Sequence, residues 1–152
     1  MSKFADMELV IDDGSTVDAA SHVQGKIVAL YLVDVDEADC NTIARNLNEL
    51  EDKLEVAGKP FEVIVMSADR EEKRLIESSF GMGQWSRFDS MTMIEPLLAE
   101  YNMLDAPALR IVSSDGTEVA DFAVEELQDF ANGGTSATDL YEEWKANELM
   151  DD

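Results

Sequence analysis

Residues 26–33 read KIVALYLV, and residues 61–67 read FEVIVMS. Both runs have the length of a strand and the continuous apolar character of strands buried on both faces of a sheet. Between them, four aliphatic residues recur at four-three-four spacing from Ile43 to Leu54, which predicts a helix over 41–57. A strand, a helix and a second strand in this order predict a parallel β-α-β unit.

The rest of the chain continues this alternation of strands and helices. The further elements expected are a short strand over 7–11, a helix over 70–80, a helix with Pro96 in its first turn running to Met103, a strand over 109–113, an antiparallel strand over 118–122 after a turn at 114–116, and a helix over 137–149. The predicted fold class is therefore α/β, with a central mixed sheet flanked by helices, a C-terminal antiparallel hairpin and a final helix.

The chain is strongly acidic. Its 152 residues contain 34 Asp and Glu against 11 Lys and Arg, which gives a formal net charge of −23. This charge argues against nucleic acid and against anionic membrane surfaces as partners, because both attract basic proteins. Residues 111–152 hold 12 acids and a single base, Lys145, so they form either a solvated acidic surface or a docking surface for a positive partner.

One cysteine, Cys40, and one histidine, His22, limit the possible chemistry. A single cysteine excludes an intrachain disulfide and a Cys-x-x-Cys redox pair. His22 lies in a polar stretch without a matched nucleophile, and we expect it to be a surface residue. The N-terminus has no apolar leader region and no apolar run is long enough to span a membrane, so the expected location is the cytoplasm. No pattern calls for a cofactor.

The densest acidic segment, Asp34–Cys40, reads DVDEADC and directly follows the first buried strand. Asp39 is expected to be the N-cap of the next helix, with Cys40 at the start of that helix. An EF-hand loop fails on this segment because Asp39 stands where glycine is required and Arg45 where glutamate is required. We therefore expect weak divalent-cation binding at most, and no defined metal site.

The order and spacing of several segments resemble the thioredoxin superfamily, and within it the tryparedoxin and nucleoredoxin branch. The matching segments are Gly25-Lys26 with the strand KIVALYLV, FEVIVMSADREE at 61–72, Trp85, and Ala106-Pro107-Ala108. The resemblance implies a thioredoxin-like domain over 1–132, followed by an acidic helix and tail over 133–152. It also implies that Pro107 takes the place of the family's cis-proline beside the active site.

The family's Trp-Cys-Pro-Pro-Cys motif falls on Asp36, Glu37, Ala38, Asp39 and Cys40 in this resemblance. Glu37 then stands in place of the nucleophilic cysteine, and only the second, resolving cysteine remains as Cys40. A dithiol exchange needs both sulfurs, because the first attacks and the second releases the mixed disulfide. The resemblance therefore implies a redox-inactive member of the branch, in which no residue is expected to be catalytic.

The face that binds partners in this family would remain usable. It would comprise Asp34, Asp36, Glu37, Trp85, and the pair Ala106-Pro107. Its acidic character favours a protein partner with a basic surface. Two other functions stay open: a monothiol oxidoreductase that uses Cys40, and an acidic binder of divalent cations.

Overall fold

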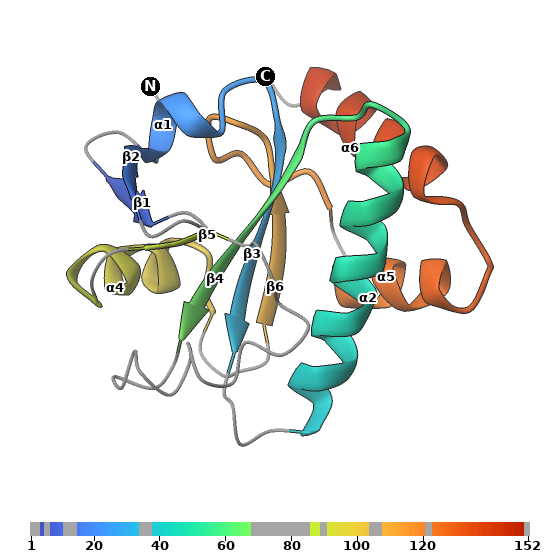
Figure 1. Ribbon diagram of the computed structural model, residues 1–152, viewed down its shortest axis with the longest axis horizontal. Coiled ribbons are helices and arrows are strands. Elements are labelled where there is room, and N and C mark those ends of the chain that lie inside the picture. The colour runs from blue at the N-terminus through green and yellow to red at the C-terminus, as the bar shows by residue number, and fades with distance from the viewer. Residues whose placement is uncertain are drawn as a thin grey trace.

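The computed structural model describes residues 4, 7–10, 15–33, 38–67, 86–88, 91–103, 108–120 and 123–150. Within these ranges, six strands form one mixed sheet with helices on both of its faces (Figure 1). The strands are β1 (Glu8–Val10), β2 (Thr16–Asp18), β3 (Ile27–Val33), β4 (Phe61–Ser67), β5 (Ser86–Phe88) and β6 (Ala108–Val112). The helices are α1 (Ala19–His22), α2 (Ala38–Val56), α4 (Met91–Glu100), α5 (Ala123–Ala131) and α6 (Ala137–Met150).

The strand order across the sheet is β2-β1-β5-β4-β3-β6. Strands β3 and β4 are parallel along their whole length, from the Ile27–Phe61 pair to the Val33–Ser67 pair. Strand β6 is antiparallel to β3, β5 is parallel to β4, and β1 is antiparallel to β5 and β2. The mixed sheet predicted from the two apolar runs is therefore confirmed, with β3 and β4 in its interior.

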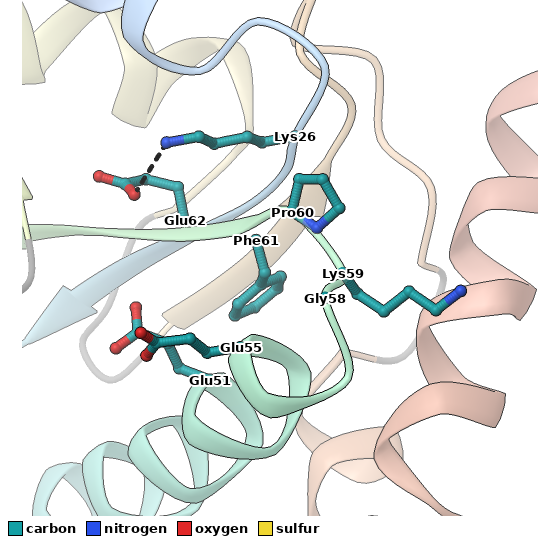
Figure 2. Close-up of a pocket in the computed structure, with 8 residues that line it drawn as sticks. All are labelled: Lys26, Glu51, Glu55, Gly58, Lys59, Pro60, Phe61 and Glu62. Atoms are coloured by element: carbon teal, nitrogen blue, oxygen red, sulfur yellow. Dashed lines mark ion pairs between the residues drawn. The ribbon is translucent and has the colours of Figure 1, made fainter.

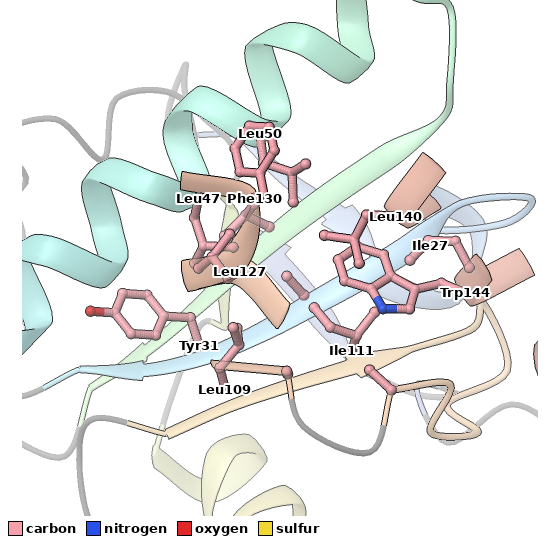
Figure 3. Close-up of a cluster of buried hydrophobic side chains, with 14 of the residues drawn as sticks. Ile27, Tyr31, Leu47, Leu50, Leu109, Ile111, Leu127, Phe130, Leu140 and Trp144 are labelled. Carbon is pink, nitrogen blue, oxygen red and sulfur yellow. The ribbon is translucent and has the colours of Figure 1, made fainter. Parts of the chain in front are cut away.

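Alternate residues of β3 and β4 enter two separate cores, which explains why β3 is apolar throughout and β4 is apolar except at Glu62 and Ser67. One core lies between the sheet and helices α2, α5 and α6, and includes Tyr31 and Trp144 (Figure 3). The other lies on the opposite face, against α1, α4 and the N-terminal strands, and includes Leu30 and Met66. Figure 1 shows the same arrangement, with α2, α5 and α6 on one side of the sheet and α4 on the other.

Helix α2 begins at Ala38, three residues earlier than expected, so Asp39 is the second residue of the helix. The prediction of Asp39 as N-cap is wrong. A carboxylate is stabilised by the positive end of the helix dipole both at the cap and in the first turn, so composition alone does not separate the two positions. The helix ends at Val56, one residue before the predicted end, and Gly58 follows it with φ at 74° while the Lys59 N–H donates to the Leu54 carbonyl oxygen at 2.9 Å.

Helix α4 begins at Met91 and contains Pro96 in its interior, so the expectation that Pro96 lies in the first turn is wrong. An interior proline removes one N–H from the helix ladder. The buried side chains of Leu97 and Tyr101 dock this segment on the sheet. Tertiary packing of this kind sustains a helix despite an unfavourable local residue.

The hairpin after β6 is confirmed at its base, where Val112 bridges Glu118 and the Val119 N–H donates to the Ile111 carbonyl oxygen at 2.9 Å. Among the described residues, the strand predicted over 118–122 is reduced to this bridge. Helix α5 follows and was not predicted, although its buried residues Ala123, Leu127 and Phe130 recur at helical spacing.

The final helix is confirmed. Helix α6 spans Ala137–Met150 and buries Leu140, Tyr141 and Trp144. The short strand expected over 7–11 is β1. The helix expected over 70–80 lies outside the described residues.

Candidate functional site

The acidic segment 34–37 connects the carboxyl end of β3 to the N-terminus of α2. Strand β3 ends at Val33, and α2 begins at Ala38, so Ala38, Asp39 and Cys40 are the first three residues of the helix. Ligands of open α/β sheets gather at the carboxyl ends of the strands, where connections of this kind lie. Asp34, Asp36 and Glu37 lie outside the described residues, so their predicted part in a binding face stays a prediction.

The register of the sheet brings a second predicted segment to the same edge. Ala108, the first residue of β6, pairs with Leu32 near the end of β3. The chain therefore enters β6 from residues 104–107 beside the point where β3 leads into residues 34–37. Ala106 and Pro107 themselves lie outside the described residues.

Trp85 was also predicted to belong to this face. It lies outside the described residues, and the strand that follows it, β5, begins with Ser86 opposite Ile64 in the middle of β4. The described register thus places the end of β3 beside the start of β6. It gives no such placement for Trp85.

The N-terminus of α2 defines the electrostatics of this edge. The helix dipole places partial positive charge at Ala38–Cys40, and this charge stabilises an anion, either a thiolate or a carboxylate.

No metal site and no membrane span accompany this edge in the part of the chain that the structure describes. No three His, Cys, Asp or Glu side chains there come together as metal ligands. None of the helices there is both long and apolar enough to cross a bilayer.

A pocket of about 360 Å³ lies at the opposite end of the parallel strands, where β3 and β4 begin (Figure 2). It is lined by Lys26, Glu51, Glu55, Gly58, Lys59, Pro60, Phe61 and Glu62. The walls come from the last turns of α2, the loop after it, and the first residues of β4. This pocket is separated from Cys40 by the full length of the strands.

His22 contacts Glu62 of the pocket lining and is half-buried, whereas the sequence predicted a surface residue. Its Nε2 is 2.8 Å from Oε2 of Glu62, and the two side chains are only 25% and 15% exposed. Lys26 Nζ lies 3.5 Å from the other oxygen of Glu62. The contact partner of His22 is 40 residues away, so no local pattern identifies it. One sequence feature could have predicted such a contact: Glu62 is a carboxylate inside a buried strand, and a buried carboxylate requires a partner.

A second pocket, of about 470 Å³, lies along the outer edge of β6 and contains Arg110. The Arg110 guanidinium donates hydrogen bonds to three carbonyl oxygens, those of Tyr101 at 3.0 Å, Asn102 at 3.3 Å and Leu109 at 3.0 Å. Two of these residues follow directly after α4, so the guanidinium lies at the negative end of that helix.

Tyr101 secures the same corner of the molecule. Its O–H donates to the Gly116 carbonyl oxygen in the turn after β6, and burial raises the pKa of the Tyr101 hydroxyl above its usual range. Tyr101 and Arg110 therefore join the end of α4 to β6 and to the hairpin. The contacts of Tyr101 and Arg110 therefore have a structural role.

Comparison with known proteins places these observations in a family. A family model described as thioredoxin-like matches residues 25–118. The chain is similar to a thioredoxin from Wuchereria bancrofti, with a TM-score of 0.71 and 23% identity over 96% of this chain and 99% of that one. No curated protein sequence matches the chain.

Tryparedoxins are also among the similar structures. Tryparedoxin I from Crithidia fasciculata has a TM-score of 0.67 and 24% identity over 81% of this chain and 85% of that one. The tryparedoxin from Trypanosoma brucei has a TM-score of 0.68 and 26% identity over 86% and 93%. These similarities confirm the predicted fold and the predicted resemblance to the tryparedoxin branch.

Proposed function

Because the chain belongs to the thioredoxin-like family, we propose that it is a redox-inactive member that binds protein partners through the face where the family carries out thiol chemistry. One observation carries the proposal. The chain's single cysteine, Cys40, lies in the first turn of the helix that follows β3, and the residue three positions before it is Glu37. A dithiol exchange needs a second sulfur at that spacing.

The expected partner is a protein with a basic surface. Asp34, Asp36 and Glu37 precede the helix, Asp39 lies in its first turn, and the whole chain carries a net charge of −23. A charge of this size attracts positive surfaces over long range and repels negative ones. The proposal includes a cytoplasmic location, which is supported by a sequence that uses one cysteine and can form no internal disulfide.

The test is the reduction of insulin disulfides by the purified full chain with dithiothreitol as the electron donor. An active thioredoxin serves as the positive control, and the Cys40→Ser variant serves as the matched control. We expect the wild-type chain to match Cys40→Ser and to give no acceleration over dithiothreitol alone. A rate near that of the active thioredoxin would refute the proposal.

Binding through the face is tested separately with a mixture of basic protein domains as bait. Reversing two charges with Asp36→Lys and Glu37→Lys should abolish capture of any domain that the wild-type chain retains. The matched control is the same reversal at Asp129 of α5 and Glu143 of α6, two exposed positions that are distant from the N-terminus of α2 along the chain. Equal loss in both variants would show attraction by net charge alone.

A monothiol function is the second candidate, and the position of Cys40 in the first turn of α2 favours it. A single thiolate there would attack the disulfide of a small thiol and form a mixed disulfide, releasing the other half as a thiol. The pH dependence of Cys40 alkylation separates the two functions. A midpoint below about 7 supports the monothiol function, and one above about 8.5 supports the adaptor.

A further inference from the structure

One asparagine of the chain precedes a glycine, and this pair lies in the turn that joins α5 to α6 (Figure 1). The pair is Asn132-Gly133, and α5 ends at Ala131, directly before it. Both residues of the pair are exposed. The side chain of Asn132 forms no hydrogen bond with the described part of the chain, so its carboxamide can turn toward the backbone.

The surroundings of Gly133 leave room for a reaction between that carboxamide and the next backbone nitrogen. The φ angle of Gly133 is 85°, a left-handed conformation that glycine adopts without strain. A Cβ atom at this position would have no heavy atom within 4 Å apart from its neighbours in the chain. A five-membered ring that joins Asn132 to Gly133 therefore has open space beside the backbone.

Hydrogen bonds at the end of α5 hold this turn. The Gly133 N–H donates to the Phe130 carbonyl oxygen at 3.1 Å, and the Gly134 N–H donates to the Asp129 carbonyl oxygen at 2.8 Å. The Gly133 nitrogen must leave its bond to Phe130 before it can react. Helix ends fray, because their last hydrogen bonds open at a low cost in free energy. We therefore expect this bond to slow a reaction at Gly133 without preventing it.

We propose that Asn132-Gly133 is a site of spontaneous deamidation, at which Asn132 becomes aspartate or isoaspartate. The Gly133 nitrogen attacks Cγ of Asn132 and gives up its proton, the bond from Cγ to Nδ2 breaks, and the side-chain nitrogen takes the proton and leaves as ammonia. Water then opens the cyclic imide. Cleavage of the bond from the ring nitrogen to Cγ gives aspartate, and cleavage of the bond to the backbone carbonyl carbon gives isoaspartate.

Both products change the connection between α5 and α6. A carboxylate at position 132 adds negative charge at the C-terminal end of α5, where the helix dipole is already negative and Asp129 carries a charge of the same sign. Isoaspartate also inserts one carbon into the backbone. The Asp129 side chain lies against Gly134, so the turn has little room to adjust on that side. We expect the docking of α6 through Trp144 to loosen.

The experiment is a long incubation of the full chain in mildly alkaline buffer, followed by measurement of released ammonia and by peptide mapping with mass spectrometry. Asn102 provides the matched internal control, because it also lies in an exposed turn but precedes Met103. We expect Asn132 to react at least about tenfold faster than Asn102, since a side chain on the attacking residue hinders formation of the ring. Asn132→Ala should remove most of the ammonia.

A second readout follows the consequence for the fold. The deamidated fraction should unfold at a lower urea concentration than the fresh chain, whereas Asn132→Ala incubated in the same way should keep its midpoint. The proposal is overturned if Asn132 of the folded chain stays intact over the time in which it is converted in the urea-unfolded chain. It is also overturned if Asn102 reacts as fast. The proposal goes beyond the function proposed above and does not depend on it, because neither result involves insulin reduction or Glu37.

Discussion

The indole ring of Trp144 in α6 stacks on the ring of Phe61 at the start of β4, with centroids 6.2 Å apart and planes inclined by 17°. Trp144 is fully buried, and one turn earlier the Tyr141 O–H donates to the Pro60 carbonyl oxygen at 3.0 Å. These contacts dock the C-terminal helix on the strand that forms the pocket. The position of Phe61 therefore depends on α6, although the two are more than 80 residues apart in the chain.

Removal of the indole should destabilise the whole fold. Trp144→Ala is expected to lower the free energy of unfolding by about 3–5 kcal/mol, because it removes a large buried side chain and leaves a cavity. Urea unfolding followed by circular dichroism measures this loss. The neighbouring Glu143→Gln, at an exposed position, should change stability by less than about 0.5 kcal/mol. A loss below about 1 kcal/mol for Trp144→Ala would contradict the packing of α6 into the core.

The contact between His22 and Glu62 should appear as energetic coupling. The single variants His22→Ala and Glu62→Gln and the double variant form a cycle, in which we expect a coupling of about 0.5–3 kcal/mol in unfolding free energy. The cause is the 2.8 Å contact between two mostly buried groups. Additive effects of the two substitutions would mean that the pair does not form in solution.

Asp115 predicts a specific pH dependence of stability. The Ser113 hydroxyl and then the Thr117 N–H donate to its carboxylate, and these hydrogen bonds hold the pKa of Asp115 below its usual value of 3.8. A depressed folded-state pKa contributes stability that is present above the unfolded pKa and is lost as the pH falls through the folded value.

Asp115→Asn should therefore lower stability at neutral pH, and the difference from the wild type should shrink as the pH falls below about 4. Paired urea titrations at a series of pH values measure this difference. A gap between the two proteins that stays constant across the acidic range would show that ionisation of Asp115 does not contribute.

Arg110 should not tolerate lysine. A lysine ammonium cannot reproduce the fork that donates to the carbonyl oxygens of Tyr101, Asn102 and Leu109, so Arg110→Lys should lower stability by about 1–2 kcal/mol. The same exchange at the exposed Arg45 of α2 provides the control and should have almost no effect. If Arg110→Lys and Arg45→Lys had the same free energy of unfolding, the hydrogen bonds of the Arg110 guanidinium would not contribute to stability.

The buried strands β3 and β4 were predictable because both of their faces enter a core, which makes nearly every residue apolar. Helix ends were less predictable. Asp39 suits the cap and the first turn equally well, and Pro96 is held inside α4 by packing that no local pattern reports. The unpredicted helix α5 follows a single bridge at Glu118, where the alternation of residues also fits a strand.

For the candidate site, the sequence placed Cys40 correctly at the start of a helix, because the apolar run before it ends sharply. The pocket at the other end of the sheet could not be predicted. Its lining includes Glu55 of α2, Glu62 of β4 and Lys26, which precedes β3, and His22 of α1 contacts Glu62. Contacts between segments that are far apart in the chain depend on the whole fold, so the spacing of residues in the sequence does not predict them.

The central claim is that Glu37 stands where a thioredoxin-like scaffold requires its attacking cysteine. The variant Glu37→Cys tests it most directly, because the new thiol would lie three residues before Cys40 at the N-terminus of α2. After oxidised glutathione is added, we predict an intramolecular disulfide that protects both thiols from alkylation, together with a gain of insulin reduction that the further substitution Cys40→Ser abolishes. If both thiols of Glu37→Cys stay open to alkylation and insulin reduction stays at the wild-type level, the claim is contradicted.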